Sequence, residues 1–97
     1  MKIKVLRSAH DSIIEGFNFY KAQEQGLGAN FIESIMADIR SLHITGGGHQ
    51  IVQSGFHRKV CSKFPYSIYY KVENSDLNIH RILDNRRDPN WISKQLN

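Results

Sequence analysis

Basic and aromatic side chains gather in the second half of this chain, and these residue types can bind or cleave nucleic acid. From Phe56 onward polar and apolar residues alternate with a period of two, which predicts β-strands. With Tyr66, Ile68 and Val72 facing a core, the other face of the sheet carries cations, imidazoles and one aromatic ring. Such a surface suits phosphate contact and base stacking, although a solvated sheet face without any ligand gives the same pattern. The residues of this predicted face are His57, Lys59, Lys63, Tyr69, Lys71 and His80.

A metal-independent ribonuclease would draw on the same region. It needs a base for the 2′-hydroxyl group, cations for the charge that develops on the phosphate, and an acid for the leaving oxygen. His57 or His80 could exchange the protons, while Lys59 and Arg81 could stabilise the charge. No fixed spacing ties these residues together, and no carboxylate is placed to orient a histidine. Under this hypothesis the candidate catalytic residues are Lys59, His80 and Arg81.

The other histidines and the single cysteine do not form a metal-binding motif. His43, His49, His57 and Cys61 are spread over a predicted loop and strand, without the closely spaced pairs of structural zinc sites. We therefore expect no metal and no cofactor. Cys61 fits a small, half-buried residue better than a nucleophile, and it has no second cysteine for an internal disulfide.

The net charge of +4 is confined to the second half of the chain. Residues 1–49 carry five Lys and Arg against five Asp and Glu, whereas residues 50–97 carry eight against four. This asymmetry favours a polyanionic target or an acidic partner for the second half. A solvated basic face with no ligand is the alternative.

Two amphipathic helices are predicted ahead of the strands. A short strand at residues 3–6 comes first, and Ser8 then offers an N-cap for a helix that ends at Gln25-Gly26. A second helix begins near Gly28 and ends before the loop Gly46-Gly47-Gly48. Its apolar residues recur at intervals of three and four, which is the clearest periodicity in the chain. They are Phe31, Ile32, Ile35, Met36, Ile39 and Leu42.

Three strands follow the helices, and turns at Pro65 and at residues 73–76 join them into an antiparallel meander. Because only a few residues join the two helices, the helices must form an antiparallel hairpin. The hairpin and the sheet bury each other, which predicts an α+β domain of order β-α-α-β-β-β. The N-terminal short strand and the α-helical hairpin then pack on one face of an antiparallel sheet. At 97 residues the chain is one domain, residues 1–97.

Arg81 does not fit the alternation of the last strand. Strict alternation puts it on the same face as Ile79 and Leu83, with Ile82 opposite, and a buried unpaired guanidinium would be costly. A β-bulge, a position at the rim of the sheet, or a carboxylate partner would each remove the conflict.

The apolar runs are too short to cross a bilayer, which takes roughly 20 residues. The N-terminus also lacks the apolar stretch and the cleavage site of a secretory signal. We therefore expect a cytoplasmic protein without a membrane partner.

The stretch from Phe64 to Trp91 resembles the C-terminal half of RelE/ParE-type toxins. Those proteins share Phe-Pro-Tyr, an alternating tyrosine-rich strand, a polar turn, an apolar strand, and Arg-Asp-Pro with a nearby Trp. The order of the elements ahead of this stretch is also similar. The corresponding pieces here are Phe64-Pro65-Tyr66, Ile68-Tyr69-Tyr70, Leu77-Ile79-Ile82-Leu83, and Arg87-Asp88-Pro89 with Trp91.

The resemblance implies the toxin of a type II toxin–antitoxin system, of the kind associated with plasmid stabilisation and growth inhibition. Such a toxin is silent while its cognate antitoxin wraps an extended or helical segment around it. A basic chain with an apolar groove beside its helical hairpin suits such a segment. Arg86 and Arg87 are further candidates for contact with the target or with the antitoxin.

The family divides by target. RelE-like members cut messenger RNA on the ribosome with basic sheet residues and a terminal tyrosine or histidine, whereas ParE-like members bind and poison DNA gyrase. Many relatives carry His where this chain has Asp84, and the tail after Trp91 contains neither Tyr nor His. Losing these acids and bases favours ParE-like inhibition of gyrase. The alternatives are a ribosome-dependent, metal-independent mRNA endonuclease and a degenerate toxin that only binds its antitoxin.

Overall fold

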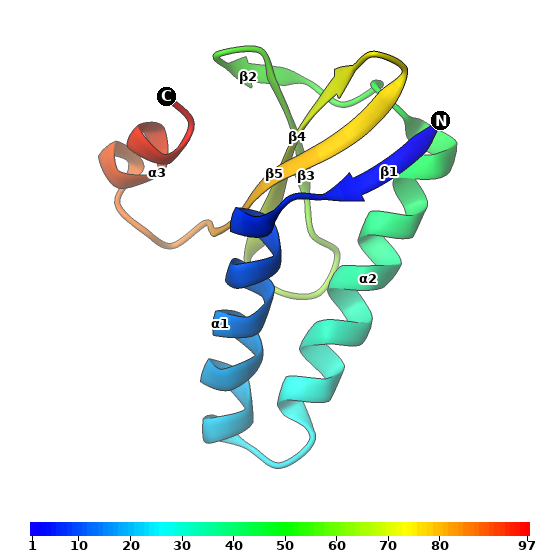
Figure 1. Ribbon diagram of the computed structural model, residues 1–97. Helices are drawn as coiled ribbons and strands as arrows, with labels where there is room; N and C mark the ends of the chain where they lie inside the picture. Colours follow the sequence, from blue (N-terminus) through cyan, green and yellow to red (C-terminus); the bar gives the residue numbers. More distant parts are fainter.

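The computed structural model describes residues 1–97 and confirms the predicted α+β architecture. Two long helices lie side by side against a twisted sheet, and a short third helix lies apart from them (Figure 1). Strand β2 and helix α3 are additional to the predicted order. None of the helices has both the length and the apolar character that a bilayer crossing needs. In chain order the elements are β1 (Lys2–Val5), α1 (Arg7–Gln23), α2 (Leu27–Thr45), β2 (Ile51–Gln53), β3 (Phe56–Val60), β4 (Tyr66–Glu73), β5 (Asp76–Asp84) and α3 (Pro89–Gln95).

The five strands form one sheet in the order β1-β5-β4-β3-β2. Strands β3 to β5 pair antiparallel, as predicted for the meander, and the additional strand β2 pairs antiparallel with β3. Strand β1 lies parallel to β5, with Ile3 opposite Leu77 and Val5 opposite Ile79, so the sheet as a whole is mixed. Strands β1 and β2 are therefore its two edges.

Helix α1 begins without the predicted cap. Leu6 occupies the N-cap position and makes no side-chain cap bond. The Ser8 hydroxyl donates instead to the backbone carbonyl oxygen of His80 in β5. Ser8 therefore ties the first turn of the helix to the sheet. The sequence could not distinguish this contact from an N-cap, because both need a small hydroxyl side chain at the start of a helix.

Two glycines allow the helices of the hairpin to approach closely. Gly26 has a φ of 83°, a left-handed conformation that lets the chain reverse between the helices. Gly16 lies against the ring of Phe31, and a Cβ at position 16 would stand 2.5 Å from the ring Cζ. A larger residue at position 16 would therefore force the helices apart.

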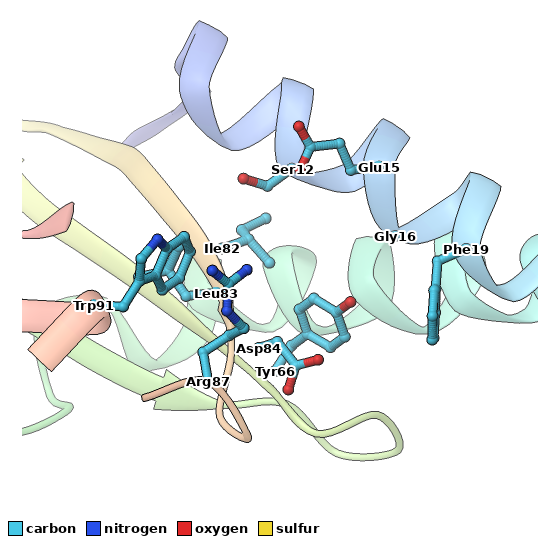
Figure 2. Close-up of a pocket in the computed structure, with 10 residues that line it drawn as sticks. All are labelled: Ser12, Glu15, Gly16, Phe19, Tyr66, Ile82, Leu83, Asp84, Arg87 and Trp91. Atoms are coloured by element: carbon cyan, nitrogen blue, oxygen red, sulfur yellow. The ribbon is translucent and has the colours of Figure 1, made fainter. Parts of the chain in front are cut away.

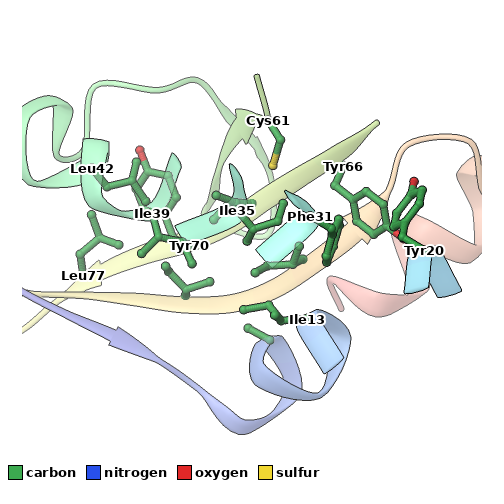
Figure 3. Close-up of a cluster of buried hydrophobic side chains, with 14 residues drawn as sticks. Ile13, Tyr20, Phe31, Ile35, Ile39, Leu42, Cys61, Tyr66, Tyr70 and Leu77 are labelled. Carbon is green, nitrogen blue, oxygen red and sulfur yellow. The ribbon is translucent and has the colours of Figure 1, made fainter. Parts of the chain in front are cut away.

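The main core lies between the hairpin and one face of the sheet (Figure 3). The predicted stripe of α2 is confirmed, since four of its six members are buried there and the other two, Ile32 and Met36, are partly buried against the core. Rings from both layers meet at one end of the core, with Phe31 5.2 Å from Phe64 and 5.1 Å from Tyr66. Val72, expected in the core, is 40% exposed near the end of β4, whereas Tyr70, two residues before it on the same strand, is fully buried. The four buried residues of the stripe are Phe31, Ile35, Ile39 and Leu42.

A β-bulge in β5 resolves the conflict at Arg81. The pairing of β5 with β4 skips His80, which opposes no residue. The extra residue shifts the alternation, so Ile79 and Ile82 both enter the main core while Arg81 and Leu83 lie on the other face. The prediction that Leu83 shares the face of Ile79 is wrong for this reason. Of the three explanations offered for Arg81, the bulge is the one found.

Helix α3 covers part of the second face of the sheet. Asp88 caps it by accepting a hydrogen bond from the Asn90 N–H at 2.9 Å, and Pro89 fits its first turn. Trp91 and Ile92 pack against a small second core beneath the helix. The face that was predicted to offer its cations and aromatic ring to a ligand is therefore partly covered by the chain itself. The buried residues of this second core are Phe56, Tyr69, Leu83 and Leu96.

Candidate functional site

The predicted cationic face is split between the two sides of the sheet. His57 pairs with Tyr70 and Lys59 pairs with Ile68, so both basic residues lie on the side that faces the hairpin. The His57 ring stacks on the Tyr70 ring, with 5.0 Å between their centroids. The expected placement is wrong for these two residues because Phe56 is buried under α3, which sets the alternation of β3 the other way.

Tyr69, Lys71 and His80 do lie on the second face, as predicted. Tyr69 is only 3% exposed, so it belongs to the second core and is not a free stacking surface. The Lys71 ammonium lies over the Phe56 ring, 4.4 Å from its centroid, and the His80 ring meets Phe56 edge-on at 5.2 Å. Lys63 lies on neither face, because it belongs to the turn between β3 and β4, beside α2.

The three candidate catalytic residues do not converge. Arg81 holds α3 to the sheet: its Nε donates to the carbonyl oxygen of Gln95 at 3.1 Å and its Nη1 to that of His80 at 3.1 Å. The His80 Nε2 lies 3.2 Å from the Glu73 carboxylate. Lys59 is on the opposite side of the sheet. A single phosphate group therefore cannot contact Lys59 and Arg81 together.

Arg58, which sequence reasoning missed, lies in a polar network on the second face. Its Nε donates to the Ser67 hydroxyl at 3.1 Å and its Nη2 to the Asn85 side-chain oxygen at 3.4 Å. Ser67 is fully buried and donates to the same oxygen at 2.7 Å. The sequence concealed this residue because Arg58 alternates in phase with Phe56 and Val60, a pattern that suggests the apolar side of a strand.

Arg86 and Arg87 have different environments. Arg86 forms an ion pair with Asp84 at 2.7 Å and also reaches the Tyr20 hydroxyl at 3.4 Å. Arg87 forms no ion pair, and its guanidinium stacks on the Trp91 ring, 3.7 Å from the centroid. A stacked guanidinium keeps its N–H edge free for an anion. Arg87 is therefore the cation of this pair that is available to a ligand.

Arg87 stands between two pockets. The first lies between α1 and the segment after β5, encloses about 290 Å³, and has Phe19 and Trp91 on its walls (Figure 2). The second lies between the sheet and α3, encloses about 350 Å³, and is lined by Arg58 and Asn85 among others. Arg87 lines both pockets. We call these two pockets together the α3 site.

The ionisable groups of the α3 site favour recognition of charge over proton transfer. Hydrogen bonds from Arg86 hold the pKa of the Asp84 carboxyl below its ordinary value. Burial raises the pKa of Tyr66 to about 12, with further contributions from Tyr20 and Asp84. A carboxylate that stays ionised and a phenol that stays protonated are both poorly matched to acid–base catalysis near pH 7.

No group of three or more His, Cys, Asp or Glu side chains lies close enough together to hold a metal ion. Cys61 is buried, and burial followed by the charge of Asp38 raises its pKa to about 12. Because the thiolate is the reactive form, this thiol is a poor nucleophile at neutral pH.

Comparison with known proteins places the fold. No protein-family model matches the sequence, and no curated protein matches it either. Among solved structures, a chain of the chromosomal ParDE TA system from P. aeruginosa is similar, with a TM-score of 0.73 over 84% of this chain and 92% of that chain. This chain has the fold of that ParDE component. The sequences are 20% identical, so the likeness shows a shared backbone fold alone.

Proposed function

We propose that this chain is the toxin of a type II toxin–antitoxin pair. The main support is the fold match to the ParDE chain, which extends over most of both chains. The sequence from Phe64 to Trp91 adds to it, since this stretch builds β4, β5 and the start of α3, and so contributes to both pockets of the α3 site.

Within that class, ParE-like inhibition of DNA gyrase is the activity that the geometry supports best. The observation that carries this choice is the position of Lys59 and Arg81 on opposite sides of the sheet. A ribonuclease needs its cations and its proton donor around one phosphate, and here His80 and Arg81 are engaged with Glu73 and with α3. A protein that acts by binding needs no such convergence.

The cognate antitoxin is assigned to the first pocket of the α3 site. Phe19 is 49% exposed on α1 beside this pocket, and Trp91 forms its other wall, which suits an apolar residue of an antitoxin helix. The free edge of Arg87 suits a carboxylate from an acidic antitoxin. Because Arg87 also lines the second pocket, a bound antitoxin would also cover part of that pocket. A short acidic reading frame next to this gene is expected.

The test is induced expression in a bacterium, with DNA breaks, supercoiling and transcript integrity followed over the first minutes. DNA damage with intact messenger RNA is expected, together with inhibition of supercoiling by purified gyrase. The matched variants are Lys59→Ala and Arg81→Ala. The proposal gives neither residue a catalytic role, so a folded variant should still inhibit supercoiling. Rapid loss of messenger RNA with normal supercoiling, abolished by either variant in a folded protein, would establish the endonuclease instead.

The antitoxin contact is tested with Phe19→Asp and Arg87→Glu. Co-expressed antitoxin should fail to neutralise or to co-purify with the Phe19→Asp chain, which should still inhibit growth. Arg87→Glu should weaken antitoxin binding and toxicity together. Lys21→Glu, a charge change elsewhere on α1, is the control and should leave neutralisation intact. A Phe19→Asp chain that is neutralised normally would exclude this pocket.

A further inference from the structure

One continuous part of the chain contains no carboxylate. Residues 39–72 hold five Lys and Arg and three His but no Asp or Glu. The other residues hold eight Lys and Arg against all nine Asp and Glu. Residues 39–72 form the end of α2 and the strands β2, β3 and nearly all of β4. The whole positive excess of the protein therefore lies in this segment, whose strands make up the half of the sheet that ends at the edge strand β2.

The two edges of the sheet are protected unequally. An open edge presents unpaired backbone groups, and natural proteins commonly defend it with lysines. Edge β1 has Lys2 and Lys4 exposed, and Lys4 is paired with Asp76 at 2.9 Å. Edge β2 has no charged residue, and its Ile51 and Val52 are 59% and 43% exposed. Edge β2 is therefore the one that can accept another strand.

The backbone of β2 is presented in a defined orientation. The Arg58 N–H donates to the carbonyl oxygen of Gln50 at 2.9 Å, so Gln50 faces β3. The alternation of an antiparallel pair then turns the N–H and C=O of Ile51 outward. The end of the strand is also held, because the Gln53 amide donates to the carbonyl oxygen of Ser93 at 2.9 Å. An incoming segment thus meets a strand whose position is already fixed.

One lysine and two imidazoles, none of them with an acidic partner, border this edge. His57 lies opposite Ile51 on β3, and its Nδ1 is 2.7 Å from the carbonyl oxygen of His49. Lys59 is close enough to His49 to lower its pKa, second only to the effect of burial, and Lys59 forms no ion pair. Neighbouring strands lie about 4.8 Å apart, so a strand added outside β2 would lie roughly 10 Å from β3, and its carboxylates would be about one Debye length from Lys59 at 0.1 M salt.

We propose that the outer edge of β2 binds an extended segment of an acidic partner protein, which adds to the sheet as a sixth strand. Main-chain hydrogen bonds to Ile51 would provide the affinity, and alternating apolar and acidic side chains would provide the selectivity. A second copy of this chain is a poor occupant because it would bring the same carboxylate-free edge against Lys59 and the histidines. This interaction is separate from the α3 site and does not require the chain to be a toxin.

The probe is a fluorescein-labelled peptide of alternating valine and glutamate, and its binding to the whole chain is followed by fluorescence polarisation. Binding should weaken as salt is raised. Two further peptides carry backbone N-methyl groups at every second residue, one at the odd and one at the even positions. Because alternate N–H groups of a strand face opposite directions, one of these peptides should bind at least tenfold more weakly and the other nearly as well as the parent peptide. Equal effects in both methylated peptides, or no binding at low salt, would overturn the proposal.

Two substitutions at one position make the matched pair. Ile51→Pro removes the outward N–H without removing a hydrogen bond to β3 and should abolish peptide binding. Ile51→Thr keeps that N–H and should retain binding within about threefold. Circular dichroism checks that both variants fold. Equal binding of oligothymidylate by both variants at this edge would assign the edge to nucleic acid. Dimerisation that is lost in the Ile51→Pro variant would assign it to a second copy of the chain. Either result would overturn the proposal.

Discussion

The two faces of the sheet are covered in different ways. The hairpin face buries a cluster of fourteen residues drawn from both long helices and the strands, whereas the second face buries a cluster of four. The second cluster is closed by Leu96, next to the C-terminus, and by backbone contacts of α3 such as the Arg81–Gln95 hydrogen bond. Stability is therefore concentrated on the hairpin face, whereas Arg58 and Arg87 of the α3 site lie at the weakly packed second face. A change on the second face can alter recognition while the fold survives.

The largest effect should come from the main core. Phe31→Ala removes a fully buried ring that contacts Tyr20, Phe64 and Tyr66, and it should lower the free energy of unfolding by about 3–5 kcal/mol. Urea denaturation measures it. Phe19→Ala, at a half-exposed position on α1, is the control and should cost far less. Similar losses for the two variants would contradict the unequal division of stability.

A smaller loss is expected where the two helices touch. Gly16→Ala places a methyl group 2.5 Å from the Phe31 ring, and overpacking of this kind costs about 1–3 kcal/mol. The gain in helix propensity offsets roughly 1 kcal/mol of that cost. Gly47→Ala is the control and should be nearly neutral, because the atom nearest to its new Cβ would be at an ordinary 3.5 Å. Thermal melts of the two variants measure the difference. A stabilised Gly16→Ala protein would show that the hairpin can widen freely.

The second core should open locally and not globally. Leu96→Ala should destabilise α3 by about 2 kcal/mol, at the low end for a buried leucine, because a terminal helix can shift to fill the space. Native-state hydrogen exchange should show faster exchange of the α3 amides while the amides of α2 are unchanged. Matching acceleration in both helices would mean that the two faces form one cooperative unit.

The smallest effect is electrostatic and depends on pH. The pKa of Asp84 is lowered in the folded state, so its ion pair with Arg86 contributes stability above the unfolded pKa and loses it as pH falls through the folded value. Asp84→Asn should therefore cost less than about 1 kcal/mol at pH 7, because Arg86 is largely exposed. The difference from the parent chain should shrink as pH falls below the ordinary aspartate pKa of about 3.9, in acid titrations followed by circular dichroism. A constant difference at all pH values would assign the effect to packing.

The elements with strong local periodicity could be predicted from the sequence. The stripe from Phe31 to Leu42 fixed α2, and the alternation after Pro65 fixed the meander. The side of the sheet taken by His57 and Lys59 could not be predicted, because it depends on which face buries Phe56, and α3 decides that from the far end of the chain. Arg58 was missed for the same reason. A seven-residue helix such as α3 has too few turns to show a period.

The bulge in β5 has a consequence for how the layers are joined. In a regular strand the carbonyl oxygen of His80 would be used within the ladder, but here it accepts the Ser8 hydroxyl from the start of α1 and the Arg81 guanidinium that holds α3. One oxygen atom is thus a shared anchor for the coverings of both faces. Deleting a single residue at this point would restore an unbroken strand and detach both helices from the same acceptor.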